Sequence, residues 1–483
     1  MTDLRTGALF TRGLLSEPDL VAAQALIERV AKSDLETIRV LFPDQHGVLR
    51  GKTLVASALP SVFRSGIAVP GTLLLKDTSH RTAFPVWSGG QSGHGGVLEQ
   101  LHGASDVLLV PDPGTFRILP WAPHSAWLLC DAVYRDGTPI PFAPRTVLRR
   151  AQDQLAQAGM FARMGLEIEF HVFRVTDPQL AHGQTTMPGA PPQTQALTQG
   201  YQFLTEDRYA AAEPVLDMIR RNAQGLGLPL RSIEIEMGPS QFEVTFDPDT
   251  PMAHADAMVM FRSMVKAVCA AQGLHATFMA KPCLPNVAAS GWHLHQSVLD
   301  AAGRNLFVPE GEGLSRTAQG WIAGLLEHAA ESCLLTAPTV NSYKRYGAYQ
   351  LAPNRIAWGR DNRGAMVRAL MTAGDPASRV ENRVAEPGAN PYYAFAAQLL
   401  CGLAGVQSGA VPPAPTDTPY DSDAPELPAN LGAAIAAFDG SDLYRSALGE
   451  AFVAYMAQLK TFEWNRYLAD LSAWEQSEYF TLL

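Results

Sequence analysis

The sequence predicts an α+β protein with two unequal domains. Residues 1–140 carry short strand-and-turn patterns, the first over Ile38–Phe42 and the second over Val48–Val55. From residue 141 onward, helical periodicities alternate with strands that place acids on every second residue. These observations predict a small sheet-rich domain over residues 1–140 and a larger domain of strands and helices over residues 141–483.

The first domain is expected to begin with a helix and to continue as a sheet. Ser16 followed by Glu17-Pro18-Asp19 is typical of a helix start, because the hydroxyl caps free N–H groups and proline suits the first turn. A Pro-Asp-Gln-His-Gly turn at 43–47 joins the two strands. In the larger domain, the helix that follows Pro144 is expected to end at Gly159.

Alternation and composition predict the remaining elements. Period-two alternation predicts strands in four segments, at 165–173, 233–236, 241–246 and 291–297. Segments rich in Pro, Thr and other turn residues predict long surface loops at 176–200 and 411–428. Helical spacing at 441–479, with few residues suited to chemistry, predicts structural helices there.

Composition excludes several classes of protein. Of the 483 residues, 47% are hydrophobic and 17% are charged, which argues against a disordered chain. The net charge of −10 argues against a nucleic-acid-binding protein, which would carry a basic surface. Because no run of 18 apolar residues and no signal-peptide pattern occurs, and because five scattered cysteines suit a reducing compartment, we expect a cytoplasmic protein without a membrane partner.

Glutamates gather on one face of the predicted strands. Glu167 and Glu169 alternate on one strand, and the pattern recurs at Glu234-Ile235-Glu236 and at Glu243. Crowded carboxylates repel one another unless cations lie between them. His293 and His295 add imidazoles, also at period two. Oxygen ligands with one imidazole favour Mg²⁺ or Mn²⁺ over zinc, although two acids alone would also suit a glycosidase.

Arginines form a second group later in the chain. They are Arg345, Arg360, Arg363, Arg368, Arg379 and Arg383. The guanidinium fork matches carboxylate and phosphate oxygens, so the group predicts an anion site. Glu381 lies between two of them, where alternation would point the three side chains in one direction. Metal-binding acids beside phosphate-binding arginines are typical of phosphoryl transfer, whereas a glycosidase needs no such arginines.

Seven motifs, in this order, resemble those of the glutamine synthetase family. They lie at Phe42–Gly47, Gly165–Phe170, Glu236–Glu243, Ser290–His293, Asn341–Arg345, Asp361–Arg363 and Arg379–Arg383, before Pro387–Tyr392. The resemblance implies an N-terminal β-grasp domain and a C-terminal catalytic domain with an antiparallel sheet and flanking helices. It also implies a homo-oligomer, commonly a dodecamer of two hexameric rings, whose active sites are shared between neighbouring subunits.

The resemblance further implies a role for each motif residue. One Mg²⁺ or Mn²⁺ ion would be held by Glu169, Glu236 and Glu243, and another by Glu167, His293 and Glu381. Glutamate would be bound by Arg345, Arg383 and the backbone at Ala289. ATP would be bound by His295, Ser297, Arg368 and Arg379. The residues implied in catalysis are Asp44, reaching in from a neighbouring subunit, and Arg363 and Glu381. ATP would phosphorylate the γ-carboxylate of glutamate, and an amine would then displace phosphate.

Departures from the family pattern concern the amine. The position of the flap glutamate in ammonia-using members is Leu351 here, and an expected Asn-Gly pair is Ala288-Ala289. The residues at Trp358–Arg363 are similar to the corresponding segment of the γ-glutamylpolyamine synthetase branch. We therefore predict a ligase for an organic amine, with ammonia-using glutamine synthetase and an inactive structural relative as alternatives.

The sequence leaves polyamines and alkyl or aromatic monoamines equally open as substrates. The segment 73–87, expected near the amine, offers one acid, Asp77, for the far ammonium of a polyamine. Trp87, Trp292 and Leu351 either offer apolar surface for a monoamine or belong to the hydrophobic core.

Overall fold

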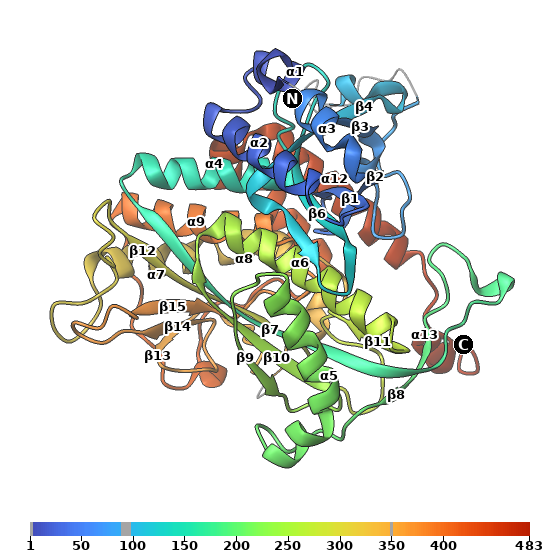
Figure 1. The fold of residues 1–483 in the computed structure, drawn as a ribbon. Coiled ribbons are helices and arrows are strands. Elements are labelled where there is room, and N and C mark those ends of the chain that lie inside the picture. The colour runs from blue at the N-terminus through green and yellow to red at the C-terminus, as the bar shows by residue number, and fades with distance from the viewer. Residues whose placement is uncertain (1–2, 88–97, 348–350) are drawn as a thin grey trace.

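The strands of the protein form two sheets, which Figure 1 shows at opposite ends of the molecule. The structure, a computed structural model, describes residues 3–87, 98–347 and 351–483. The N-terminal sheet has the order β2-β1-β6-β4-β3, with β5 paired to β6. Its strands are β1 (Thr37–Pro43), β2 (Leu49–Val55), β3 (Ile67–Pro70), β4 (Asp106–Pro111), β5 (Arg117–Leu119) and β6 (Ala122–Val133). β1 pairs in parallel with β6 and antiparallel with β2.

The predicted first helix is confirmed as α2 (Glu17–Ala31). The backbone N–H of Asp19 donates to Ser16 Oγ at 3.3 Å, and the backbone N–H of Ser16 donates to Asp19 Oδ2 at 3.1 Å. This reciprocal cap satisfies two N–H groups that a helix start leaves free. The other N-terminal helices are α1 (Ala8–Thr11) and α3 (Leu59–Ser65).

The second sheet carries the predicted acid-rich strands. Its order is β13-β14-β15-β12-β7-β10-β9, and β8 and β11 also pair with β7. Its strands are β7 (Phe161–Asp177), β8 (Gln193–Ala196), β9 (Leu230–Ile235), β10 (Gln241–Asp249), β11 (Leu274–Thr277), β12 (Trp292–Leu299), β13 (Trp358–Arg360), β14 (Val367–Leu370) and β15 (Arg379–Asn382). All described pairs are antiparallel except β13 with β14, so the predicted α+β class is confirmed.

Helices cover one face of this sheet and leave the other for the site. On β7, Ile168 and Phe170 are buried, and Phe170 packs edge-on against Phe261 of α6 at 5.8 Å between ring centroids. The period-two alternation of a strand therefore turns the glutamates of β7 toward the opposite face. The helices of this region are α4 (Pro144–Gln157), α5 (Glu206–Gly225), α6 (Pro251–Ala270), α7 (Arg316–Glu327), α8 (Ala329–Thr336), α9 (Pro391–Ser408), α10 (Leu431–Asp439), α11 (Asp442–Leu448), α12 (Glu450–Leu468) and α13 (Ala473–Tyr479).

The C-terminal helix α12 packs back onto the N-terminal region. Tyr455 Oη donates to the carbonyl of Leu74, and Gln458 Nε2 donates to the carbonyl of Ala83 at 3.0 Å. The two predicted domains are therefore in contact within one chain, and the boundary at residue 140 stays a prediction. None of the described helices has the length and apolar character needed to cross a lipid bilayer.

One predicted loop is partly wrong. The segment 176–200 contains the end of β7 and the strand β8, which pair from Phe173 opposite Ala196 onward. β8 consists of Gln, Thr and Ala, so it lacks the apolar alternation that identifies a strand. The loop predicted at 411–428 is confirmed apart from a short 3₁₀ turn at Pro419–Asp421.

Candidate active site

The register of four neighbouring strands brings the predicted ligands together. Glu167 on β7 lies opposite His293 on β12, and Glu169 lies opposite Glu243 on β10. His295 on β12 lies opposite Glu381 on β15. Because directly opposite residues of antiparallel strands have side chains on the same face, these residues converge on one surface of the sheet.

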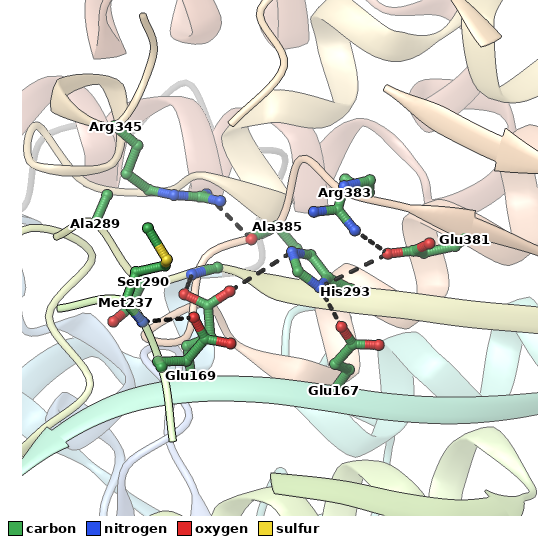
Figure 2. Close-up of polar contacts among 12 residues, drawn as sticks. Glu167, Glu169, Met237, Ala289, Ser290, His293, Arg345, Glu381, Arg383 and Ala385 are labelled. Atoms are coloured by element: carbon green, nitrogen blue, oxygen red, sulfur yellow. Dashed lines mark hydrogen bonds and ion pairs between the residues drawn. The ribbon is translucent and has the colours of Figure 1, made fainter. Parts of the chain in front are cut away.

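Imidazoles and carboxylates form a continuous cluster on this surface (Figure 2). His293 Nδ1 lies 2.9 Å from Glu167 Oε1 and 3.7 Å from Glu381 Oε1, and His293 Nε2 lies 3.8 Å from Glu169 Oε1. Burial and the charge of Arg383 lower the pKa of His293 and favour its neutral form. Nδ1 faces both Glu167 and Glu381, so with the proton on Nε2 its lone pair can bind a metal ion between these carboxylates.

Among the described residues, three groups of side chains have ligand atoms within 4.8 Å of one another. The first is Glu169, Glu236 and Glu243, as predicted. The second predicted set is arranged differently, because Glu167 groups either with Glu243 and His293 or with His295 and Glu381. His295, predicted to contact the nucleotide, thus also belongs to the cluster, with Nε2 at 2.9 Å from Glu167 Oε2.

The carboxylates of the cluster are buried close to one another. Burial and the charge of Glu236 raise the pKa of Glu169 to about 8, and burial and the charge of Glu167 raise that of Glu236 to about 7. Burial and the surrounding glutamates raise the pKa of Glu243 well above its usual value. By contrast, hydrogen bonds from both histidines outweigh burial and lower the pKa of Glu167. Buried oxygen donors that repel one another fit Mg²⁺ or Mn²⁺.

The predicted arginines divide into buried and exposed members. Arg345 is buried and donates from Nη1 to the carbonyls of Val384 at 2.9 Å and Ala385 at 3.1 Å. Arg383 is buried and ion-paired to Glu381. Nε of Arg345 and Nε of Arg383 are buried without a hydrogen-bond partner, so each keeps an unused N–H donor beside the cluster.

Glu381 connects two arginines of the site. Arg383 pairs with Glu381 Oε1, and Arg368 Nη1 donates to Glu381 Oε2 at 3.0 Å. Arg368 also donates from Nε to Asp361 Oδ1 at 2.9 Å. Although burial alone would raise it, the charges of His293 and Arg383 lower the pKa of Glu381. Glu381 therefore fixes the arginines as well as facing the metal cluster.

Four predicted site residues lie outside this network of side chains. Asp44 is buried under its own turn, where it pairs with Arg50 at 2.5 Å and accepts from the backbone N–H of Val48 at 2.9 Å. Arg363 is exposed and Ser297 is partly buried. Ala289 contacts the site through its backbone carbonyl, which accepts from Gln241 Nε2 at 2.9 Å. The roles predicted for these four residues stay predictions.

Gln241 is a site residue that the sequence analysis missed. Its Nε2 lies 3.0 Å from Glu169 Oε2, 2.9 Å from the Ala289 carbonyl and 3.2 Å from Ser290 Oγ. Its Oε1 accepts from the backbone N–H of Gly238 at 2.9 Å. Alternation with Glu243 on the same strand was a signal for this residue, because it places both side chains on the same face.

The apolar side chains considered as contacts for the amine also divide into buried and exposed members. Trp292 is fully buried and packs against Phe395 at 5.4 Å between ring centroids, so it is a core residue and its predicted place beside a monoamine is wrong. Trp87 and Leu351 are exposed. Asp77 is buried, accepts from the backbone N–H of Arg81 at 2.8 Å and pairs with Arg466 at 3.0 Å. Its carboxylate is thus committed within the chain.

Comparisons with known proteins agree with this geometry. The family described as glutamine synthetase, catalytic domain, matches residues 141–479. A γ-glutamylanilide synthase from Acinetobacter is 38% identical over 481 residues, covering 96% of each chain. A γ-glutamylethanolamide synthetase from Streptomyces coelicolor is 33% identical over 454 residues, covering 92% of this chain and 93% of that protein. A solved structure described as a GmaS/ADP complex matches with a TM-score of 0.78 and 30% identity, covering 94% of this chain and 99% of the other.

Proposed function

The chain belongs to the glutamine synthetase family, and on that premise we propose that it is an ATP-dependent ligase that joins the γ-carboxylate of glutamate to an organic amine. The observation that carries the proposal is the cluster of Glu167, Glu169, Glu243 and His293 beside two buried arginines with unpartnered Nε atoms. Such a site can hold cations and anions at once, as phosphoryl transfer to a carboxylate requires.

The reaction has two balanced steps. An oxygen of the glutamate γ-carboxylate attacks the γ-phosphorus of ATP, and ADP leaves. The amine nitrogen then attacks the acyl carbon, the bond from that carbon to the phosphate oxygen breaks, and the nitrogen loses a proton. Arg345 and Arg383 are suited to hold the α-carboxylate or the acyl phosphate, because each presents a free Nε–H in a buried site.

The metal ligands are proposed as Glu169, Glu236 and Glu243 for one ion, and Glu167, His293 and Glu381 for another. Bound Mg²⁺ or Mn²⁺ would offset the negative charges of the reacting groups. The chemistry of the donors supports this assignment, since they are carboxylates and one imidazole.

The nucleotide is proposed to bind beside Arg379. A cavity of about 280 Å³ is lined by Arg379, Asp361 and Arg360 together with apolar residues such as Met371. Arg379 Nε donates to His295 Nδ1 at 3.2 Å, and His295 contacts Glu167. Two hydrogen bonds therefore link a lining residue of the cavity to Glu167 of the metal cluster.

The acceptor is proposed to be a monoamine. Leu351 stands where a carboxylate would hold ammonium, and its side chain is exposed. The carboxylate of Asp77 is occupied by Arg466 and backbone N–H groups, so it cannot receive the second ammonium of a polyamine. These two observations favour a monoamine over both ammonia and a polyamine.

A homo-oligomer with shared sites is also proposed. The C-terminal segment after α12 exposes Leu471, Trp474, Phe480 and Leu483, which are between 62% and 97% exposed. Exposed apolar side chains in such density are typical of an interaction surface. Truncation after residue 469 should reduce the mass measured by light scattering, and an unchanged mass would count against this role for the segment.

Phosphate release from ATP and glutamate tests the proposal. The panel of acceptors is ammonia, putrescine, isopropylamine, ethanolamine and aniline, with Mg²⁺ present. We expect an organic monoamine to give the highest kcat/KM. Preference for ammonia would identify a glutamine synthetase, and preference for putrescine would overturn the monoamine assignment. An inactive relative would show no stimulation by any acceptor.

A further inference from the structure

A cavity of about 500 Å³ is lined by Met237, the residue that follows the proposed metal ligand Glu236 in the chain. It lies between the segment 196–201, which follows β8, and the turn 237–239, which joins β9 to β10; Asn286 lies on a third side. This volume falls within the range of small-molecule sites.

The walls of the cavity are tied to the metal cluster by hydrogen bonds. The backbone N–H of Met237 donates to Glu236 Oε2 at 3.1 Å, and the backbone N–H of Tyr201 donates to the Met237 carbonyl at 2.8 Å. A Cβ at Gly200 would lie 2.4 Å from the same carbonyl, so glycine permits this close approach. Figure 2 shows Met237 beside Glu169, so the cavity opens next to the proposed metal site.

The lining of the cavity is uncharged. Of the described residues that line it, none is Asp, Glu, Lys, Arg or His. Tyr201 and Met237 present large side chains that are 67% and 53% exposed. Thr198, Gln199 and Asn286 supply polar groups without charge. Such a surface suits an aromatic or alkyl group, because ring and thioether contacts are favourable there. The residues that line the cavity offer no counter-charge to a second ammonium.

We propose that this cavity receives the carbon substituent of the acceptor amine and that Tyr201 and Met237 select an uncharged, preferably aromatic, substituent. The inference rests on the proposed ligase function. The amine nitrogen must approach the γ-carbon of glutamate beside the metal cluster, and its substituent must then occupy space next to that cluster. The cavity beside Glu236 meets this requirement with the chemistry of an arylamine.

Two variants and one control test the inference in the full-length protein. Tyr201→Ala removes an aromatic wall and should lower kcat/KM for aniline roughly tenfold, while kcat/KM for methylamine changes little. Asn286→Asp adds a negative charge in a side chain of nearly the same volume. The ratio of kcat/KM for putrescine to kcat/KM for aniline should then rise at least tenfold. The control is Tyr467→Ala, which changes an exposed tyrosine on α12 outside the cavity. It should leave the ratio of kcat/KM for aniline to that for methylamine unchanged, and likewise the ratio for putrescine to aniline.

The outcomes separate the inference from the function on which it rests. If no amine stimulates phosphate release in the unsubstituted protein, the proposed function fails. If amines are used but neither Tyr201→Ala nor Asn286→Asp changes the ratios, the cavity does not bind the substituent and the inference is overturned. The KM values for glutamate and ATP should stay within about twofold in both variants, because a general distortion of the site would change them together.

Discussion

Two buried clusters of charge in this chain differ in where their cations come from. At the junction of the N-terminal strands with α4, α6 and α9, Arg145 Nη2 pairs with Asp112 at 2.6 Å and with Asp256 at 3.3 Å, and Arg145 Nε approaches Asp131 at 3.4 Å. Although burial alone would lower it, these aspartates raise the pKa of Arg145. This cluster contains its own cation.

Among the described residues, no Lys or Arg is ion-paired to Glu169, Glu236 or Glu243. Burial and mutual repulsion raise the pKa of Glu169, Glu236 and Glu243, which favours their protonated forms in the metal-free protein. The comparison teaches that buried acids paired with an arginine stabilise the fold, whereas buried acids facing one another form a binding site at the expense of stability.

The largest expected effect is on activity. Glu243→Gln removes a ligand shared by two of the carboxylate groups, so we expect amine-dependent phosphate release to fall at least about 100-fold, beyond the loss typical of outer-shell residues. The thermal midpoint of the metal-free protein should stay the same or rise, because repulsion is relieved. An unchanged activity together with a lower midpoint would show that this cluster stabilises the fold and does not bind the catalytic metal.

The second effect is on stability. Arg145→Met leaves Asp112 and Asp256 without their buried cation, and we expect the free energy of unfolding to fall by about 3–5 kcal/mol. Thermal denaturation checks this, with kcat per folded molecule expected to change little. A variant that keeps its midpoint but loses activity would show that the Arg145 cluster is not structural.

A smaller effect is expected at Gln241. Gln241→Ala leaves Glu169 without an orienting donor, so Mn²⁺ affinity measured by calorimetry should fall roughly 10–100-fold. Gln296→Ala is the matched control, because Gln296 is equally buried but bonds to Trp321 and Gln398 instead. Equal losses of Mn²⁺ affinity in both variants would show that Gln241 acts only through packing.

The smallest expected effect is the pH dependence of the stability of the metal-free protein. Because the pKa of Glu169 is about 8 and that of Glu236 about 7, the native protein binds protons that the unfolded chain releases near pH 4.5. The metal-free protein should therefore lose stability as pH rises from about 5 to 8. Mg²⁺ should raise the thermal midpoint more at pH 8 than at pH 6. Equal shifts at the two pH values would mean that these carboxylates do not bind the metal.

Much of the site follows from period-two alternation. Glu167, Glu169 and Glu243 could be placed on one face from the sequence because a strand alternates its side chains. The clustering of arginines predicted an anion site, and the family resemblance then assigned Arg345 and Arg383 to glutamate, although both lie far apart in sequence from the acids. The strand β8 was missed because its polar residues give no apolar signal.

Other features depend on tertiary contacts that no local pattern encodes. The burial of Trp292 against Phe395 and the pairing of Asp77 with Arg466 both join distant segments. The grouping of His295 with Glu381 depends on the register between β12 and β15. The cavity beside Glu236 arises where the segment 196–201 meets the turn before β10, and only the turn belongs to one of the seven motifs.

Oxygen transfer tests the central claim most directly. Glutamate labelled with ¹⁸O in both γ-carboxylate oxygens is converted with ATP, Mg²⁺ and the best amine, and the released phosphate is analysed by mass spectrometry. The account predicts one ¹⁸O atom in each phosphate, because a γ-carboxylate oxygen leaves with the phosphoryl group when the amide forms. Unlabelled phosphate would show that ATP is hydrolysed by water, and it would contradict ligation through an acyl phosphate.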